Sequence, residues 1–392
     1  MFSKKRNGHK SFIARFIESQ YSEGRDIKVH SPDFLFLISL AIILLFGLLI
    51  LIPASFSKGC SIGDCYFYFR NQLLLGVVPG LVLFFVFSFL DYCYLKKIAV
   101  PFLVLTLALL ALVFISPFGI SYGRALRWIN LGVLSFQPSE ILKLSVIIYL
   151  SAWLGTREAE KNALKNWKNV FLPFVLLSLL IFFLLISQPD MSTLAVIIFS
   201  MLLIYYLSNV NWRFLLTTIG GALCLFALFI KFVPYRLNRV LGFLYPDIDP
   251  QGIGYQAREA IASISSGGFW GKGLGQITAK ALPEVLNDSI FALAAEGLGF
   301  IGGALIIFFY FFLFWRCLHI AKRAPDKFGY LLVNGIAFCF IVETIINLGA
   351  ILGLLPLTGI PLPLMSYGKT SMIVFLSAFG VVTSVSRRTL SS

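Results

Sequence analysis

Asp288 is the residue of this chain whose type and position best suit acid–base chemistry. It follows a polar segment, residues 234–287, that is rich in glycine, charge and turn residues, and it opens a long apolar run. A helix that begins here points its positive end at the carboxylate, which favours the ionised form and attracts an anionic substrate. An ionised carboxylate can accept a proton from an alcohol, so Asp288 is a candidate general base.

The same position also suits a structural role. Asn287, Asp288 and Ser289 follow Pro283 at the start of a helix, and each is of a type that caps helix N-termini. Local chemistry taken alone therefore favours a cap. A catalytic role stays a second interpretation, because a carboxylate at a membrane boundary can contact both water and a lipid-linked molecule.

Ionisable residues inside apolar runs must each face a partner or a cavity, and these residues include Glu140, Lys143, Glu296 and Glu343. Glu140 and Lys143 stand three residues apart and share one helix face. They form either an ion pair that locks helix packing or a polar wall of a substrate cavity, and their spacing leaves both interpretations open. For Glu296 and Glu343, the latter with Asn347 four residues on, we expect structural hydrogen bonds.

The composition predicts a membrane protein. Charged residues make up 13% of the sequence, hydrophobic residues 58%, and the mean hydropathy is +0.88, whereas soluble domains carry about 25% charged residues. About ten apolar runs are long enough to cross a bilayer. They cover residues 34–52, 72–90, 98–116, 138–154, 170–187, 191–208, 214–233, 289–315, 330–352 and 370–386. We expect an all-α polytopic membrane protein of about ten transmembrane helices, with a large extracytoplasmic loop, residues 234–287, between the seventh and eighth.

The distribution of Lys and Arg predicts the orientation. If the N-terminus is cytoplasmic, 20 of the 32 Lys and Arg lie on the cytoplasmic side, as the positive-inside rule requires. We expect cytoplasmic tails, residues 1–33 and 387–392, around a transmembrane domain, residues 34–386. The net charge of +14 then reflects topology and attraction to anionic membrane lipids. No basic patch with interleaved aromatic residues indicates a nucleic-acid partner.

The residue pattern does not support a metal or nucleotide site. The three histidines, His9, His30 and His319, are scattered without ligand spacing. The glycines of residues 267–275 follow no strand, so a dinucleotide site is excluded and we expect tight turns there. Cys60 and Cys65 share the first extracytoplasmic loop and would pair only in an oxidising compartment, which the sequence leaves open.

Six motifs, in order along the chain, resemble the SEDS family of membrane proteins, which serves cell shape, elongation, division and sporulation and includes FtsW, RodA and SpoVE. The motifs are ALRWINLGVLSFQPSEILKL at 125–144, QPD at 188–190, NRVLGFLYPDIDPQGIGYQ at 238–256, SSGGFWGKGLG at 265–275, LPEVLNDSIFALAAEGLGFIGG at 282–303 and NLGAILGLLPLTGIPLPLMSYG at 347–368. Each motif alone is weakly specific, whereas six in order are highly specific.

The resemblance implies a peptidoglycan glycosyltransferase that polymerises lipid II, an undecaprenyl-pyrophosphate-linked precursor, at the outer face of the bacterial cytoplasmic membrane. It also implies partners, namely an FtsI-like class B penicillin-binding transpeptidase and other membrane proteins of the divisome or elongasome. Asp288 matches the family's catalytic acid, and Glu140 and Lys143 match residues of its central polar cavity. Gln256 after Tyr255 indicates the FtsW branch and hence septal wall synthesis during cell division.

Further residues are expected to bind substrate. Arg127, Arg239 and Lys272 are the candidate cations for the leaving pyrophosphate, together with a divalent cation, Mg²⁺ or Mn²⁺. Gln256 and Glu284 lie in the matching motifs and are further candidates for substrate binding. Two other functions remain open. The first is a flippase that moves lipid II across the membrane. The second is a non-catalytic scaffold that activates the transpeptidase, and the departures from the family pattern beside Asp288 favour this scaffold.

Overall fold

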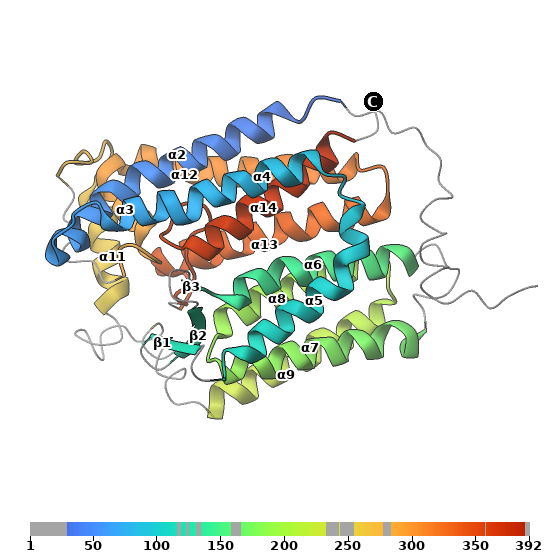
Figure 1. Ribbon diagram of the computed structural model, residues 1–392. Helices are drawn as coiled ribbons and strands as arrows, with labels where there is room; N and C mark the ends of the chain where they lie inside the picture. The colour runs from blue at the N-terminus through green and yellow to red at the C-terminus, as the bar shows by residue number, and fades with distance from the viewer. Residues whose placement is uncertain are drawn as a thin grey trace, which may run out of the picture.

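The computed structural model describes residues 30–115, 119–122, 125–130, 135–157, 166–232, 243, 255–276, 284–356 and 358–388. Long helices run side by side, with a small three-stranded sheet at one end (Figure 1). The described elements are α2 (Phe34–Gly59), a 3₁₀ turn (Cys60–Ile62), α3 (Phe67–Gln72), a π-helical turn (Leu73–Val77), α4 (Val78–Phe89), α5 (Tyr94–Leu112), β1 (Gly119–Tyr122), β2 (Ala125–Asn130), β3 (Ser135–Phe136), α6 (Pro138–Arg157), a second π-helical turn (Trp167–Phe171), α7 (Leu172–Ser187), α8 (Met191–Leu207), α9 (Trp212–Phe232), α11 (Tyr255–Ser266), α12 (Ile290–Lys322), α13 (Lys327–Ile351) and α14 (Lys369–Ser386).

These helices confirm the all-α membrane fold expected from the apolar runs. In the described part of the chain, eight helical stretches are long and apolar enough to cross a bilayer. The sixth and seventh expected spans coincide with α8, which has 17 residues, and α9, which has 21. Every expected span therefore coincides with a helix, and the protein is a multi-pass membrane protein.

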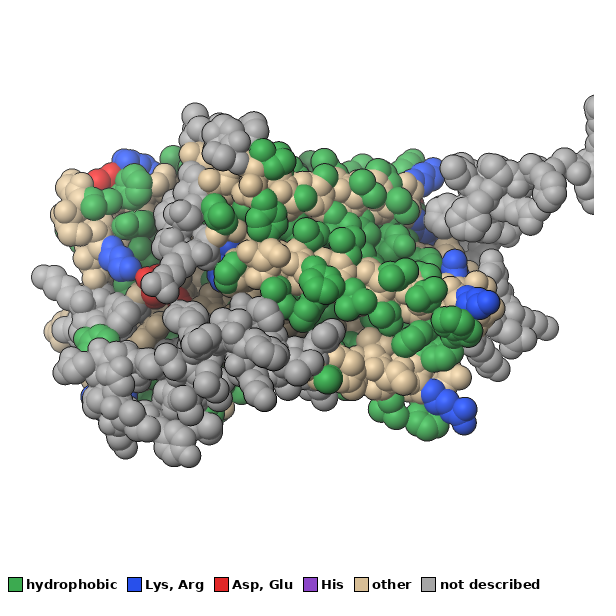
Figure 2. Space-filling view, turned by 90° about the horizontal axis from the view of Figure 1, so that it is seen from below, with side chains coloured by type: hydrophobic (Ala, Val, Ile, Leu, Met, Phe, Trp, Pro, Cys, Tyr) green, Lys and Arg blue, Asp and Glu red, His purple; other side chains and the backbone are tan. Residues whose placement is uncertain are grey.

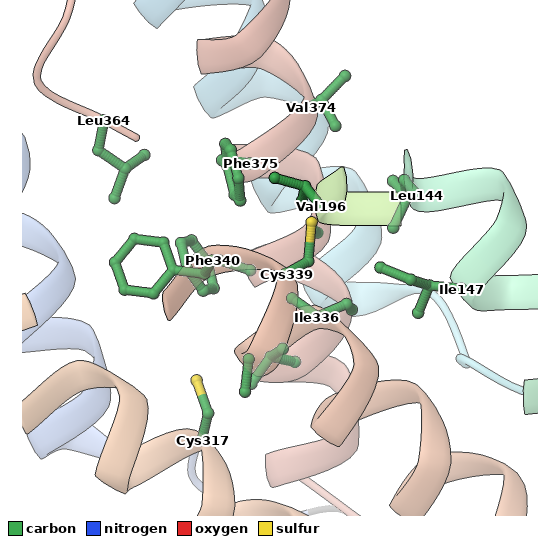
Figure 3. Packing of buried hydrophobic residues seen from close by; sticks show 14 of the residues in the cluster. Leu144, Ile147, Val196, Cys317, Ile336, Cys339, Phe340, Leu364, Val374 and Phe375 are labelled. Atoms are coloured by element: carbon green, nitrogen blue, oxygen red, sulfur yellow. The ribbon is translucent and has the colours of Figure 1, made fainter. Parts of the chain in front are cut away.

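The interior of the bundle is built from α6, α8, α13 and α14 (Figure 3). Lipid tails are as apolar as leucine, so close packing rather than water exclusion must hold these helices together. At Gly335 a Cβ would lie 2.7 Å from Ile147 and 2.8 Å from Ile204, so the missing side chain lets α13 approach α6 and α8. The ring centroids of Phe340 and Phe375 lie 6.0 Å apart across α13 and α14.

The two ends of the bundle differ. At one end, which we call the termini end, the N–H of His30 donates to the carbonyl of Arg387 at 2.8 Å. The sheet lies at the opposite end, which we call the sheet end (Figure 1). There β1 pairs antiparallel with β2, and β2 with β3, between α5 and α6. Cys60 and Cys65, also in a connection at the sheet end, are joined by a disulfide.

The helix that follows Asp288 reverses direction near its start. Gly299 has φ 69° and ψ −169°, a conformation that essentially only glycine adopts. A Cβ at Gly303 would lie 3.8 Å from the Cβ of Ala295, whereas eight residues of one straight helix would separate them by about 12 Å. Residues 290–298, here called the short arm, therefore fold back against residues 300–322, the long arm.

Gly299→Ala should lower the free energy of unfolding by about 3 kcal/mol, because the backbone conformation is strained for alanine. The new Cβ would also lie only 2.3 Å from the backbone N of Gly271, which cannot move aside like a side chain. The matched control is Gly303→Ala, which should be neutral or stabilising because alanine is favoured within a helix by about 1 kcal/mol. Thermal unfolding of the two variants in detergent measures the difference, and equal midpoints would contradict the predicted strain.

Residues 358–368 form an irregular segment that is buried at the sheet end, and we call them the buried segment. Leu364 and Met365 are almost fully buried. The Tyr310 hydroxyl donates to the carbonyl of Pro363 at 2.5 Å, and Tyr310 lies about 16 Å along the long arm from Gly299. Irregular backbone at this depth is tolerated only where protein groups satisfy it. The buried segment therefore enters the bundle.

Candidate active site

Asp288 lies in the tight turn, residues 284–289, that precedes the short arm. Glu284 has a positive φ of 48°, and its carbonyl accepts the N–H groups of Asn287 at 3.0 Å and Ser289 at 3.3 Å. The N-cap position of α12 is Ser289 rather than Asp288, and the Ser289 side chain makes no capping hydrogen bond. The half-buried Asp288 thus lies beside the positive end of the short arm.

Two elements far apart in the sequence hold Asp288. The Gln256 side chain, on α11, donates from Nε2 to Asp288 Oδ2 and to Ser289 Oγ, both at 3.4 Å. From α13, the Asn347 side chain donates from Nδ2 to the carbonyl of Asp288 at 3.0 Å and to that of Ile360 at 2.7 Å. The carboxylate and the backbone of Asp288 are therefore positioned by different helices.

The buried segment fixes the rest of the turn. The N–H of Tyr367 donates to the carbonyl of Leu286 at 2.8 Å, and the Ser366 hydroxyl donates to the carbonyl of Asn287. The fully buried Gln72 side chain donates to the carbonyl of Ser366 at 3.4 Å and accepts the N–H of Gly368 at 3.1 Å. These contacts connect α3 to the turn of Asp288. No motif or spacing in the sequence predicts that these residues pair.

Lys272, a candidate cation for pyrophosphate, forms an ion pair. Its Nζ lies 2.9 Å from Glu296 Oε1, and the Ser263 hydroxyl donates to Glu296 Oε2 at 2.9 Å. The structural role expected for Glu296 is therefore confirmed. Among the nearby glycines, Gly271 and Gly273 have φ of 84° and 88°, which confirms the expected tight turns.

Arg127, on β2, binds the connection between α7 and α8. Its Nε donates to the carbonyl of Gln188 at 3.2 Å, its Nη2 donates to that of Pro189, and its Nη1 lies 3.8 Å from Asp190 Oδ1. Asp190 Oδ2 also accepts from Gln137 at 3.1 Å. These contacts join the sheet to the helices, so Arg127 has a structural role whatever else it binds.

Glu140 and Lys143 touch each other and a third residue. Lys143 Nζ lies 2.8 Å from Glu140 Oε2 and donates to Glu343 Oε1. All three side chains are almost fully buried, between α6 and α13. The first of the two interpretations, an ion pair, is confirmed, and the pair includes Glu343 as well. The alternative, a polar wall of a substrate cavity, stays a prediction.

The remaining candidates divide into two groups. Glu284 lies in the turn of Asp288, where its carboxylate accepts from Asn287 Nδ2 at 2.7 Å. With Gln256, it completes a group of expected site residues that the structure brings to one place. Arg239 lies outside the described residues. Asn347, expected only as a structural neighbour of Glu343, proves to hold the backbone of Asp288.

Comparisons with known proteins identify the family of this chain. The sequence profile of the FtsW, RodA and SpoVE family, described as cell cycle protein, matches residues 33–390. Stage V sporulation protein E of Bacillus subtilis is 34% identical, with 92% of this chain and 98% of that protein covered. A probable peptidoglycan glycosyltransferase FtsW of Wigglesworthia glossinidia brevipalpis is 36% identical, with 89% and 91% covered.

One solved structure superposes closely on this chain. It is that of a peptidoglycan synthase complex in which polymerization and crosslinking are structurally coordinated, and one of its chains superposes with a TM-score of 0.76. That chain is 28% identical, and the match covers 91% of this chain and 98% of that one. This chain belongs to the FtsW, RodA and SpoVE family of cell cycle proteins.

Proposed function

We propose that this protein is a peptidoglycan glycosyltransferase that polymerises lipid II into glycan strands, with Asp288 as the general base. The observation that carries the proposal is a half-buried carboxylate at the N-terminal end of the short arm, held by Gln256 and Asn347. The names of relatives that cover nine tenths of the chain support the reaction class. The division branch, and hence septal wall synthesis, is part of the same proposal.

We further propose that both termini are cytoplasmic and that the sheet end faces outward across the bacterial cytoplasmic membrane. The termini end carries most of the described basic side chains, among them Lys96, Lys97, Arg323, Lys327 and Arg388, as expected for a cytoplasmic face. Asp288 would then open towards the side where glycan strands are assembled.

The proposed reaction joins two sugars. The 4-hydroxyl oxygen of the acceptor bonds to the anomeric carbon of the donor, while the bond from that carbon to the lipid pyrophosphate breaks. The hydroxyl proton passes to a carboxylate oxygen of Asp288, and the pyrophosphate leaves with the bonding electrons. General-base help of this kind contributes about 10²- to 10⁴-fold to the rate.

The charge on the leaving pyrophosphate needs a cation. Arg127 and Lys272 are each held by a carboxylate, so binding pyrophosphate would require them to share or exchange that partner. Arg239 remains the third candidate. In the described part of the chain, no three acidic, histidine or cysteine side chains gather as metal ligands. A divalent cation, Mg²⁺ or Mn²⁺, would instead arrive with the pyrophosphate and help to neutralise it, and this stays part of the proposal.

We propose a class B penicillin-binding transpeptidase as the partner, with other membrane proteins of the divisome. Support comes from the related chain in a complex that couples polymerization and crosslinking. The test is the purified protein with its transpeptidase and labelled lipid II in liposomes. Glycan strands separated by electrophoresis are expected. Movement of lipid II across vesicles without polymer would favour the flippase, and activation of the transpeptidase alone would favour the scaffold.

Asn347→Ala should slow polymerisation by about 10- to 100-fold, because a small misplacement of a catalytic group has a large kinetic effect. The change leaves the carbonyls of Asp288 and Ile360 without their donor. Asn334→Ala is the matched control, since Asn334 is buried on the same helix and donates within that helix to Tyr330. Initial rates of the two variants are compared at equal amounts of folded protein. Equal rates would show that Asn347 does not position the base.

A further inference from the structure

A polar recess lies at the termini end, where the start of α2 meets the last turns of α12 and α14. It is lined by His30, Ser31, Asp33, His319, Arg323 and Ser386, and the buried Ile320 lies among them. Imidazole, guanidinium and hydroxyl groups all donate hydrogen bonds. The recess is therefore rich in donors and lies on the opposite end of the bundle from Asp288.

The acid in the recess is already neutralised. One carboxylate oxygen of Asp33 accepts the N–H of Phe36 at 2.9 Å, and the other pairs with Arg316. Arg323, by contrast, is exposed and makes no ion pair within the described part of the chain. His30 Nδ1 already lies 3.1 Å from the carbonyl oxygen of Ser31, so the Arg323 guanidinium and the His319 ring give the recess its net affinity for an anion.

A ladder of aromatic rings runs along α12 to this recess, and we call Phe308, Phe312, Trp315 and His319 the ring ladder. Successive ring centroids are 5.8, 5.6 and 6.1 Å apart. Phe308 and Trp315 are more than half exposed, so the ladder faces outward from the bundle into the lipid. On the face shown in the space-filling view, apolar side chains cover most of the length of the bundle, and basic side chains lie towards its two ends (Figure 2).

We propose that the recess and the ring ladder together form a binding site for an anionic phospholipid. The phosphodiester would accept hydrogen bonds from Arg323 and His319, while an acyl chain follows the ring ladder towards the middle of the membrane. Basic pockets at helix ends bind anionic headgroups in this way. An apolar transmembrane helix of a partner could also cover the ring ladder. Such a helix offers no acceptor for the hydrogen-bond donors of the recess, whereas a phosphate does. This inference does not depend on the proposed enzyme activity.

The test uses the full chain in nanodiscs of phosphatidylcholine with a minor fraction of phosphatidylglycerol. Native mass spectrometry counts retained lipids, and thermal unfolding reports stabilisation. Wild type should retain phosphatidylglycerol in preference to phosphatidylcholine. Arg323→Gln should reduce this retention by about fivefold, the effect of one basic contact to an anionic headgroup. Lys322→Gln, the loss of an exposed neighbouring charge outside the recess, should change it by less than about twofold. Because anionic lipid is present in both leaflets, the result holds for either orientation.

Further measurements distinguish a lipid phosphate from a free phosphate in solution. Trp315→Ala should also weaken lipid retention, while inorganic phosphate or glycerophosphate added to phosphatidylcholine nanodiscs should not raise the unfolding temperature. Stabilisation by these soluble phosphates equal to that by the lipid would overturn the proposal in favour of a free anion. An equal loss of phosphatidylglycerol retention in Lys322→Gln and Arg323→Gln would also overturn the proposal, because general surface charge would then explain the retention. Trp315→Ala that releases the transpeptidase and leaves lipid retention unchanged would assign the ladder to a partner helix and also overturn it.

Discussion

Asp288→Asn should lower the rate of glycan polymerisation by about 10²- to 10⁴-fold, the contribution typical of a general base. Asparagine has nearly the same shape and can still accept a hydrogen bond from Gln256 through its amide oxygen. It cannot take a proton from a sugar hydroxyl at neutral pH. The fold should persist, because the contacts of the turn with Tyr367, Ser366 and Asn347 use backbone carbonyls.

The measurement is the initial rate of polymer formation from labelled lipid II, with the transpeptidase present. Asp64→Asn is the matched control, since Asp64 is an aspartate at the same end of the bundle, paired with Arg70 in the α2–α3 connection. It should keep the wild-type rate. Thermal unfolding of both variants checks the fold. An Asp288→Asn protein that is folded and polymerises within about threefold of wild type would remove Asp288 from the role of base.

The transmembrane helices were predictable because one strong physical signal specifies them. A run of apolar residues must span the bilayer as a helix, since no other short structure satisfies its backbone there. The runs at 138–154 and 370–386 accordingly coincide with α6 and α14. The helix boundaries were less well predicted. The expected span ended at residue 315, because Arg316 ends the apolar run. The helix α12 nevertheless continues through residues 316–322.

Other elements carry signals that were missed or ambiguous. α11 was expected as loop, although Ala257, Ala260, Ile261 and Ile264 repeat at helical spacing. The reversal at Gly299 was hidden, because a glycine in an apolar run is as compatible with a straight helix as with a break. No position was predicted for the buried segment, which lies in the connection between the last two expected spans. Its apolar residues were the available signal for burial.

The candidate site was predictable in its residues and not in its contacts. The motif around Asp288 predicted this carboxylate as the general base, which stays a prediction, and Gln256 was predicted from the motif that contains Tyr255. Pairs such as Arg127 with Asp190, or Lys272 with Glu296, join residues far apart in the sequence, and no local pattern specifies which opposite charges meet. The cations proposed for pyrophosphate were therefore chosen without knowledge of their carboxylate partners.

Lys143→Met should lower the free energy of unfolding by about 3–5 kcal/mol, the cost of leaving buried charges without their partner. Lys143 is the ion-pair partner of two acids, Glu140 and Glu343, and all three side chains are buried inside the bundle. Glu343 Oε2 already has no hydrogen-bond partner among the described residues. Methionine keeps the volume of the lysine stem, so the loss measures charge rather than packing.

The triple variant Lys143→Met, Glu140→Gln, Glu343→Gln separates the two interpretations of this cluster. Removing all three charges together should restore most of the stability, because a buried ion pair contributes little net stability once its desolvation is counted. Thermal unfolding and polymerisation are then measured on the same preparations. Recovery of both would identify the cluster as a lock between α6 and α13. Recovery of stability with polymerisation still lost would instead assign Glu140 and Lys143 to a polar cavity that binds substrate. A triple variant as unstable as Lys143→Met would show that unpaired charge is not the cause of the instability.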